Sequence, residues 1–160
     1  MAHEHRYEIK LTWTGAAQGP TQNYKSYSRE YRIEAPGKPT LAASADPAFR
    51  GDAALYNPED LLVASLSGCH MLTYLAYCAL QGIAVVAYED QASGTMVQEG
   101  NGGRFTEVVL RPRVTVAAGS DLVKARALHE KAHADCFVAN SVNFPVRNEA
   151  EIVADREARS

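Results

Sequence analysis

The sequence predicts an α+β domain in which long β-hairpins and a sheet wrap two main helices. The first helix, 57–81, is nearly uncharged: no Asp, Glu, Lys or Arg occurs between Leu61 and Tyr88. Strand-like alternation flanks this helix on both sides, in the order three strands, helix, hairpin, second helix and last strand. A chain of 160 residues can bury about 70% of the surface that its unfolded form exposes. We therefore expect 1–160 to form a single domain.

Three strand-like runs precede the first helix, at 7–14, 23–34 and 40–45. The segment 15–21 contains two glycines and a proline, which is typical of a hairpin connection. A turn-rich segment, 46–52, then leads to the helix. These runs predict a small sheet before the first helix.

The first helix has clear start and stop signals. Asn57 is a good N-cap, Pro58 suits the first helical position, and Glu59 and Asp60 complement the helix dipole. Gly82 is suited to end the helix near residue 81. Its length and lack of charge predict that a sheet, a second helix or a second subunit covers it on most sides.

Two strands and a second helix follow. The runs 83–98 and 104–116 predict a long β-hairpin that turns at 100–103. Ser120 or Asp121 caps a helix that reaches Ala134 and has an apolar stripe at helical spacing. A last short strand is expected at 146–153.

Charge and hydropathy exclude several classes of protein. With 16 basic and 19 acidic residues and a net charge of −3, the chain lacks the basic surface of a nucleic-acid-binding protein. The apolar stretch is long enough to span a bilayer, but polar residues interrupt it and no basic flank sets an orientation. The N-terminus lacks the apolar core of a secretory signal. We expect a soluble cytoplasmic protein that binds neither nucleic acid nor membrane.

The three cysteines differ in their positions. Cys69 and Cys78 are nine residues apart on the predicted helix, on opposite faces and about 13 Å apart along the axis. They cannot form a disulfide, which needs Cα atoms within about 7 Å. Cys78 is predicted to be a small buried hydrophobe. Cys136 follows the second helix, and the residues alone leave Cys69 as either another buried hydrophobe or a reactive thiol.

The surroundings of Cys69 resemble those of a known family. The first helix begins Asn57-Pro-Glu-Asp-Leu-Leu-Val-Ala-Ser-Leu-Ser-Gly-Cys-His70, and the second cysteine lies in Cys136-Phe-Val-Ala-Asn-Ser141. This pair of motifs resembles the OsmC/Ohr family of organic hydroperoxide reductases, as do the order and lengths of the elements. Arg50 matches the family's loop arginine, and Phe137 stands where the family has proline.

The resemblance implies an OsmC-like fold, an intertwined homodimer and a thiol-dependent peroxidase that serves in oxidative-stress defence. Cys69 would be the peroxidatic cysteine and Cys136 the resolving one, with a dithiol as reductant and neither cofactor nor metal. Thiolate chemistry in an apolar helix needs a nearby cation. We assign this role to Arg50, with Arg29 in reserve, and expect Glu59 to hold the arginine.

Two geometric expectations complete this hypothesis. Glu59 and Cys69 are about 15 Å apart along one straight helix, so the arginine bridges part of this gap or Glu59 and Arg50 come from a neighbouring subunit. A largely apolar substrate pocket is expected from the neighbours of Cys69 on its helical face, which are Ser65, Leu66, Leu72 and Thr73.

Two other functions compete with this hypothesis. The segment His129-Glu-Lys-Ala-His133 fits the HExxH pattern of zinc hydrolases. His129, His133 and Cys136 lie on one helical face and could form a three-ligand zinc site in a metallohydrolase or a zinc-binding protein. The other alternative is a non-catalytic dimer that binds apolar ligands and leaves Cys69 inert.

Overall fold

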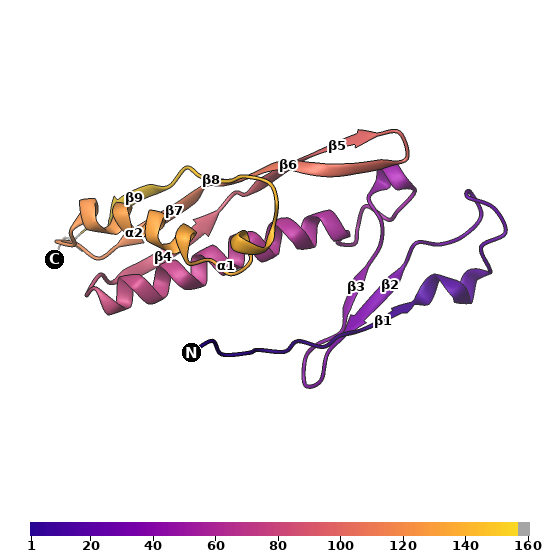
Figure 1. The fold of residues 1–160 in the computed structure, drawn as a ribbon, viewed down its shortest axis with the longest axis horizontal. Helices are drawn as coiled ribbons and strands as arrows, with labels where there is room; N and C mark the ends of the chain where they lie inside the picture. The colour runs from indigo at the N-terminus through magenta and orange to yellow at the C-terminus, as the bar shows by residue number, and fades with distance from the viewer. Residues whose placement is uncertain (157–160) are drawn as a thin grey trace. The chain divides into compact units, whose positions relative to one another are not determined.

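The computed structural model describes residues 1–156 and forms two compact units, Met1–Leu61 and Leu62–Ser160 (Figure 1). It confirms the α+β class, with two helices and three small sheets.

The first unit contains an antiparallel sheet in the order β1-β2-β3. Its strands are β1 (Lys10–Trp13), β2 (Tyr31–Glu34) and β3 (Leu41–Ala43), and two short 3-10 helices follow β1 and β3, η1 (Thr14–Gln18) and η2 (Pro47–Phe49). In the register of the sheet, Ile33 lies opposite both Leu11 and Leu41. All three predicted strands are present, but each is shorter than expected.

The largest difference concerns 23–30, which was predicted as strand and forms turns. Asn23 closes one of these turns, because its Oδ1 accepts from Lys25 N at 2.9 Å. The Arg29 guanidinium then lies over the rings of Tyr24 and Tyr27 and donates to their carbonyl oxygens. These local hydrogen bonds compete with strand pairing and override the alternation of the sequence.

Helix α1 (Pro58–Leu80) confirms the predicted central helix. Its N-terminus is a reciprocal capping box: Asn57 Oδ1 accepts from Asp60 N at 2.8 Å, and Asp60 Oδ2 accepts from Asn57 N at 3.2 Å. At its C-terminus, Gly82 has a φ of 72°, which glycine adopts without steric cost. By length and composition alone α1 could cross a membrane, but buried helices of soluble proteins meet the same criteria.

The second unit contains six strands in two sheets. The strands are β4 (Val85–Asp90), β5 (Ser93–Glu99), β6 (Gly102–Leu110), β7 (Pro112–Val116), β8 (Val146–Asn148) and β9 (Glu151–Ala154). Their orders are β4-β7-β9 and β5-β6-β8, where β8 and β9 pair in parallel with β6 and β7 and the other pairs are antiparallel. Helix α2 (Leu122–Ala134) precedes β8, and its N-cap Asp121 accepts from Lys124 N at 2.9 Å, as predicted.

A shared break separates these two sheets. The predicted long hairpin is interrupted after Asp90, whose Oδ1 accepts from Arg111 N at 2.6 Å in place of a ladder bond. The last strand runs beside both halves and breaks at the same level, where Glu149 N donates to Leu110 O at 2.8 Å. The single strand predicted at 146–153 is therefore two short strands.

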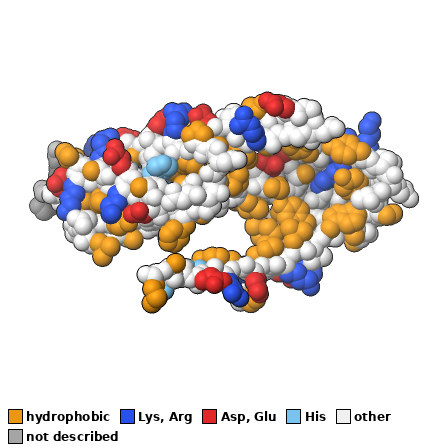
Figure 2. Space-filling model, viewed as in Figure 1, with side chains coloured by type: hydrophobic (Ala, Val, Ile, Leu, Met, Phe, Trp, Pro, Cys, Tyr) orange, Lys and Arg blue, Asp and Glu red, His pale blue; other side chains and the backbone are white. Residues whose placement is uncertain are grey.

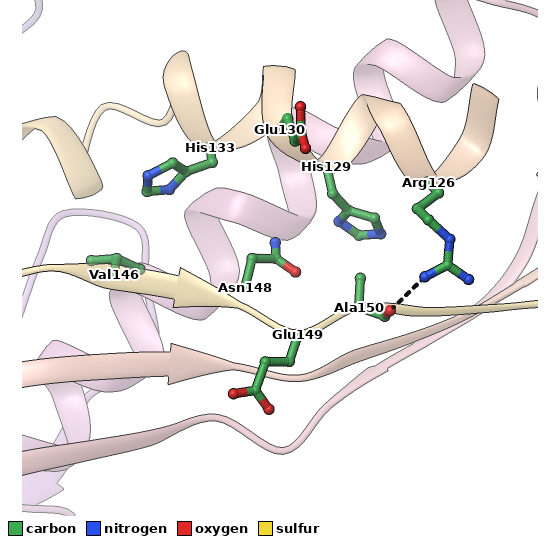
Figure 3. Close-up of a pocket in the computed structure, with 8 residues that line it drawn as sticks. All are labelled: Arg126, His129, Glu130, His133, Val146, Asn148, Glu149 and Ala150. Atoms are coloured by element: carbon green, nitrogen blue, oxygen red, sulfur yellow. Dashed lines mark hydrogen bonds between the residues drawn. The ribbon is translucent and has the colours of Figure 1, made fainter. Parts of the chain in front are cut away.

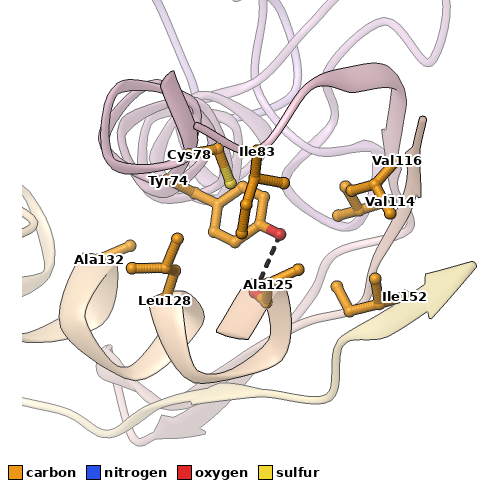
Figure 4. Packing of buried hydrophobic residues seen from close by; sticks show 9 residues of the cluster. All are labelled: Tyr74, Cys78, Ile83, Val114, Val116, Ala125, Leu128, Ala132 and Ile152. Carbon is orange, nitrogen blue, oxygen red and sulfur yellow. Dashed lines mark hydrogen bonds between the residues drawn. The ribbon is translucent and has the colours of Figure 1, made fainter. Parts of the chain in front are cut away.

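The second unit has two apolar cores. In the larger one, Tyr74 and Cys78 of α1 face α2 and strand β7, and the Tyr74 hydroxyl donates to Ala125 O at 3.0 Å (Figure 4). The other buried members of this cluster are Ile83, Val114, Val116, Ala125, Leu128, Ala132 and Ile152. The smaller core is built on Leu66, Val108 and Leu110. Burial of these side chains fixes the faces that α1 and α2 turn toward each other.

Charged side chains of both signs alternate over the face of the molecule drawn in Figure 2, without a large area of one sign. This distribution agrees with the small net charge of −3 and offers no extended basic surface on that face for a polyanion.

Candidate active site

The second unit brings Cys69 and Cys136 together. Cys69 lies on α1 and is half-buried, whereas Cys136 follows α2 and is only 1% exposed. Burial raises the pKa of the Cys136 thiol to about 11, and a hydrogen bond to the Cys69 side chain contributes in the same direction. The backbone N–H groups of Ala139 and Val138 bind the same sulfur and oppose this shift. The second unit therefore places one accessible thiol beside one buried thiol.

A tight turn after α2 directs Cys136 inward. Its N–H donates to His133 O at 3.3 Å, and its carbonyl accepts from Asn140 N at 3.0 Å. The Asn140 side chain reaches back to Ala134 O at 3.0 Å. Residues Ala139–Ser141 then form the short 3-10 helix η3. Phe137 is 78% exposed, so the turn buries the thiol and leaves the next side chain outside.

The third cysteine is separate from this pair. Cys78 is buried in the larger core beside Tyr74, and burial raises the pKa of its thiol. It is the small buried hydrophobe that the sequence predicts.

Arg50 belongs to the first unit and has an unusual backbone. It adopts the left-handed conformation with a φ of 67°, and no other non-glycine residue among 1–156 has a positive φ. The loop around it is fixed, because Asp46 O accepts from Phe49 N and Gly51 N at 2.8 and 3.0 Å. A Cβ on Gly51 would lie 1.6 Å from Ala45 O, so this close approach requires glycine. Within the described residues, the Arg50 side chain is exposed and makes no hydrogen bond or ion pair.

The other two charged candidates also lie in the first unit. Glu59 is half-buried in the first turn of α1. Burial raises the pKa of Tyr31, and the nearby negative charge of Glu59 adds to this effect. Arg29 uses two guanidinium nitrogens on the carbonyls of Tyr24 and Tyr27, so Arg50 has the freer side chain.

The four predicted pocket residues have different surroundings. Leu66 is fully buried and belongs to the smaller core, while Ser65 and Leu72 are exposed. Thr73 Oγ1 donates to the backbone carbonyl oxygen of Cys69 at 2.9 Å. Leu66 therefore belongs to the core, and a substrate pocket formed by these four residues stays a prediction.

A buried histidine pair lies next in sequence to Cys69 and was not predicted. His70 Nε2 is 2.9 Å from His129 Nδ1 and 2.7 Å from Asn148 Nδ2. Burial lowers the pKa of His70 to about 4 and that of His129 to about 3. The Tyr74 ring stacks on His129 with centroids 3.8 Å apart. Both imidazoles are therefore neutral at neutral pH and form part of the interior.

The predicted zinc ligands are not brought together. His129 and His133 of α2 both line a cavity of about 420 Å³, and Asn148 of β8 lies between them in Figure 3. His129 is turned toward His70, and Cys136 toward Cys69. Among residues 1–156, no three His, Cys, Asp or Glu side chains are grouped so that they could hold a metal ion. The HExxH spacing predicts that His129 and His133 lie on one helix. It does not reveal that His129 is buried and already hydrogen-bonded to His70.

Comparisons with known proteins identify the family and the fold. A family model described as OsmC-like protein matches residues 51–151. An OsmC-like protein of unknown function from Vibrio cholerae is 33% identical with a TM-score of 0.84, over 92% of this chain and 100% of that one. No relative was found among curated protein sequences.

Two further solved structures share the fold at lower identity. An organic hydroperoxide resistance protein from Elizabethkingia anophelis is 20% identical, with a TM-score of 0.66 over 96% of this chain and 100% of that one. Another from Bacillus subtilis is also 20% identical, with a TM-score of 0.58 over 91% and 98% of the two chains. Because the family model matches residues 51–151 and the Vibrio cholerae protein is 33% identical over 92% of this chain, we conclude that this chain belongs to the OsmC-like protein family.

Proposed function

We propose that the protein reduces organic hydroperoxides, with Cys69 as the peroxidatic residue and Cys136 as the resolving residue. The observation that carries this proposal is the contact between a half-buried thiol and a buried one. An accessible thiol can meet a substrate, and a buried neighbour is protected from it while remaining able to form a disulfide. Two proteins with a similar fold are named organic hydroperoxide resistance proteins.

The reaction divides into two steps. The Cys69 thiolate attacks one oxygen of ROOH, the O–O bond breaks, and the leaving alkoxide takes a proton to give ROH. Cys69 is then a sulfenic acid. The Cys136 sulfur attacks the Cys69 sulfur, the S–O bond breaks, and the hydroxide leaves with the Cys136 proton as water. An external dithiol reduces the disulfide and is itself oxidised.

Arg50 is proposed to stabilise the Cys69 thiolate and the departing alkoxide. Its exposed, unpartnered side chain and its left-handed backbone support this role, since strained conformations cluster at functional sites. Glu59 is proposed to orient Arg50 through a bidentate pair. We further propose that the protein acts in the cytoplasm as a homodimer in which either chain supplies Arg50 and Glu59.

Peptide mapping of the thiols tests the proposal. The protein is treated with one equivalent of cumene hydroperoxide in metal-free buffer, and all three cysteines are identified before and after. A Cys69–Cys136 disulfide with Cys78 still free is the expected result. Three unmodified thiols would overturn the proposal, and a Cys69→Ser variant that still consumes the hydroperoxide would overturn the role of Cys69.

A further inference from the structure

A second contact joins α1 to the end of α2, close to the thiol pair. The Tyr77 hydroxyl of α1 donates to Asp135 Oδ2, which belongs to the C-cap residue of α2. Lys131 Nζ lies 3.6 Å from the same carboxylate oxygen and 4.7 Å from the centroid of the Tyr77 ring. These three side chains form a single polar contact between the two helices.

The positions of Tyr77 and Asp135 relate this contact to the cysteines. Tyr77 follows Cys69 by eight residues, so both side chains lie within about 80° of each other on α1. Asp135 directly precedes Cys136 in the sequence. The thiol pair and the tyrosine–aspartate pair therefore connect the same face of α1 to the same turn after α2.

The hydrogen bond shifts the pKa of both partners. Donation to Asp135 raises the pKa of Tyr77, and acceptance from Tyr77 lowers the pKa of Asp135. Within the described residues, Asp135 accepts no hydrogen bond from a side chain of any third element. Tyr77 is thus the residue of α1 that holds this carboxylate.

We propose that Tyr77 and Asp135 are positioning residues for the second step, holding the Cys136 turn so that its thiol meets the Cys69 sulfenic acid. The inference rests on the proposed function, because it concerns the fate of that sulfenic acid. The last turn of a helix frays easily, and fraying of α2 would carry Cys136 away from Cys69.

The consequence of poor positioning is a competing oxidation. A second ROOH molecule can transfer an oxygen to the Cys69 sulfenic acid, giving sulfinic acid and ROH, and this product is not reduced by thiols. The Cys136 attack is independent of hydroperoxide concentration, whereas the competing step is proportional to it. Their ratio therefore measures how well Cys136 is held.

The test compares Tyr77→Phe with Tyr88→Phe. Tyr88 is a fitting control because it lies in the same unit and its buried hydroxyl has no hydrogen-bond partner. Rapid quenching and mass spectrometry give the rate of Cys69 sulfenic acid formation, the rate of disulfide formation, and the cumene hydroperoxide concentration at which half of Cys69 becomes sulfinic acid. Thermal unfolding confirms that both variants are folded.

For Tyr77→Phe we expect an unchanged first step, disulfide formation slower by about fivefold, as for the loss of one hydrogen bond, and half-conversion to sulfinic acid at a hydroperoxide concentration lower by the same factor. Tyr88→Phe should match the wild type in all three quantities. Asp135→Ala should reproduce the defect from the other side, and the Tyr77→Phe/Asp135→Ala double variant should be no slower than either single one.

Three outcomes would overturn the inference: unchanged partitioning in folded Tyr77→Phe and Asp135→Ala, an equal defect in Tyr88→Phe, or a double variant whose defects multiply. If Tyr77→Phe fails to fold, Asp135→Ala decides alone, because Asp135 is exposed. If the wild type forms no sulfenic acid or disulfide, the proposed function itself fails, which is distinct from all of these results.

Discussion

His70 Nε2 lies 2.9 Å from His129 Nδ1, and this contact between buried side chains links α1 to α2. The two residues are 59 positions apart in the sequence, and the rings stack with centroids 5.2 Å apart. A protonated imidazole at either position would place a charge in the interior beside a second histidine.

The histidine pair predicts a loss of stability in mild acid. The pKa values fall from an ordinary 6.5 to about 4 for His70 and about 3 for His129. Below pH 6.5 the unfolded chain therefore binds more protons than the folded one, and stability decreases as pH falls, by up to about 1.4 kcal/mol per histidine and pH unit. Above pH 6.5 both histidines are neutral in the folded and the unfolded chain, so this loss of stability is absent.

Urea unfolding at pH 7.5 and pH 5.5 checks this expectation. The wild type should lose more stability between the two pH values than His129→Gln, which has one depressed histidine fewer. Equal pH dependence in the two proteins would show that His129 is not the source.

Arg50 predicts opposite effects on stability and activity. The left-handed conformation costs an L-residue about 1–2 kcal/mol, while glycine in the unfolded chain costs about 0.5–1 kcal/mol. Arg50→Gly should therefore leave stability equal or raise it by up to about 1.5 kcal/mol, and remove most of the proposed peroxidase activity. Urea unfolding and cumene hydroperoxide consumption measure the two effects. A fully active Arg50→Gly variant would exclude a catalytic role for Arg50.

The three cysteines predict three different phenotypes. Cys69→Ser should abolish hydroperoxide reduction. Cys136→Ser should form the Cys69 sulfenic acid and then progress to sulfinic acid, because the disulfide cannot form. Cys78→Ala is the matched control, since Cys78 lies in the larger core, and it should retain activity. Mass spectrometry of Cys69 after each addition of hydroperoxide distinguishes these outcomes.

Leu66 predicts a large loss of stability without any role in substrate binding. Its side chain is fully buried with Val108 and Leu110, so Leu66→Ala should cost about 2–5 kcal/mol in the free energy of unfolding. The Val123 side chain is exposed on α2, so Val123→Ala should change the free energy of unfolding by less than about 0.5 kcal/mol. A small effect of Leu66→Ala in urea unfolding would contradict the placement of Leu66 in the core.

Sequence reasoning succeeded where the determinants are local. Asn57, Gly82 and Asp121 mark helix ends through their own side-chain or backbone chemistry, and the structure has these ends within one or two residues. Strands were harder to delimit because pairing decides their length. The interruption between Asp90 and Arg111 depends on a hydrogen bond across the hairpin, which strand alternation does not reveal.

The candidate site was predictable only in part. The resemblance singled out Cys69 and Cys136, and the fold supplies their contact. The partners of His70, Tyr77 and His129 lie on other elements, so nothing near them in sequence indicates that they are engaged. The HExxH spacing was misleading for the same reason. It predicts the helix face on which the histidines lie, but not that a side chain of another helix already binds one of them.

The turn that follows α2 has a consequence for the return half of the proposed cycle. Cys69 would be the accessible partner of the proposed disulfide, so we expect an incoming dithiol to attack its sulfur and displace Cys136 as the leaving group. A thiol whose pKa is raised to about 11 departs slowly as a thiolate. The backbone N–H groups of Val138 and Ala139 lower the pKa of this thiol, so we expect this short turn to speed the departure of Cys136 when the proposed disulfide is reduced.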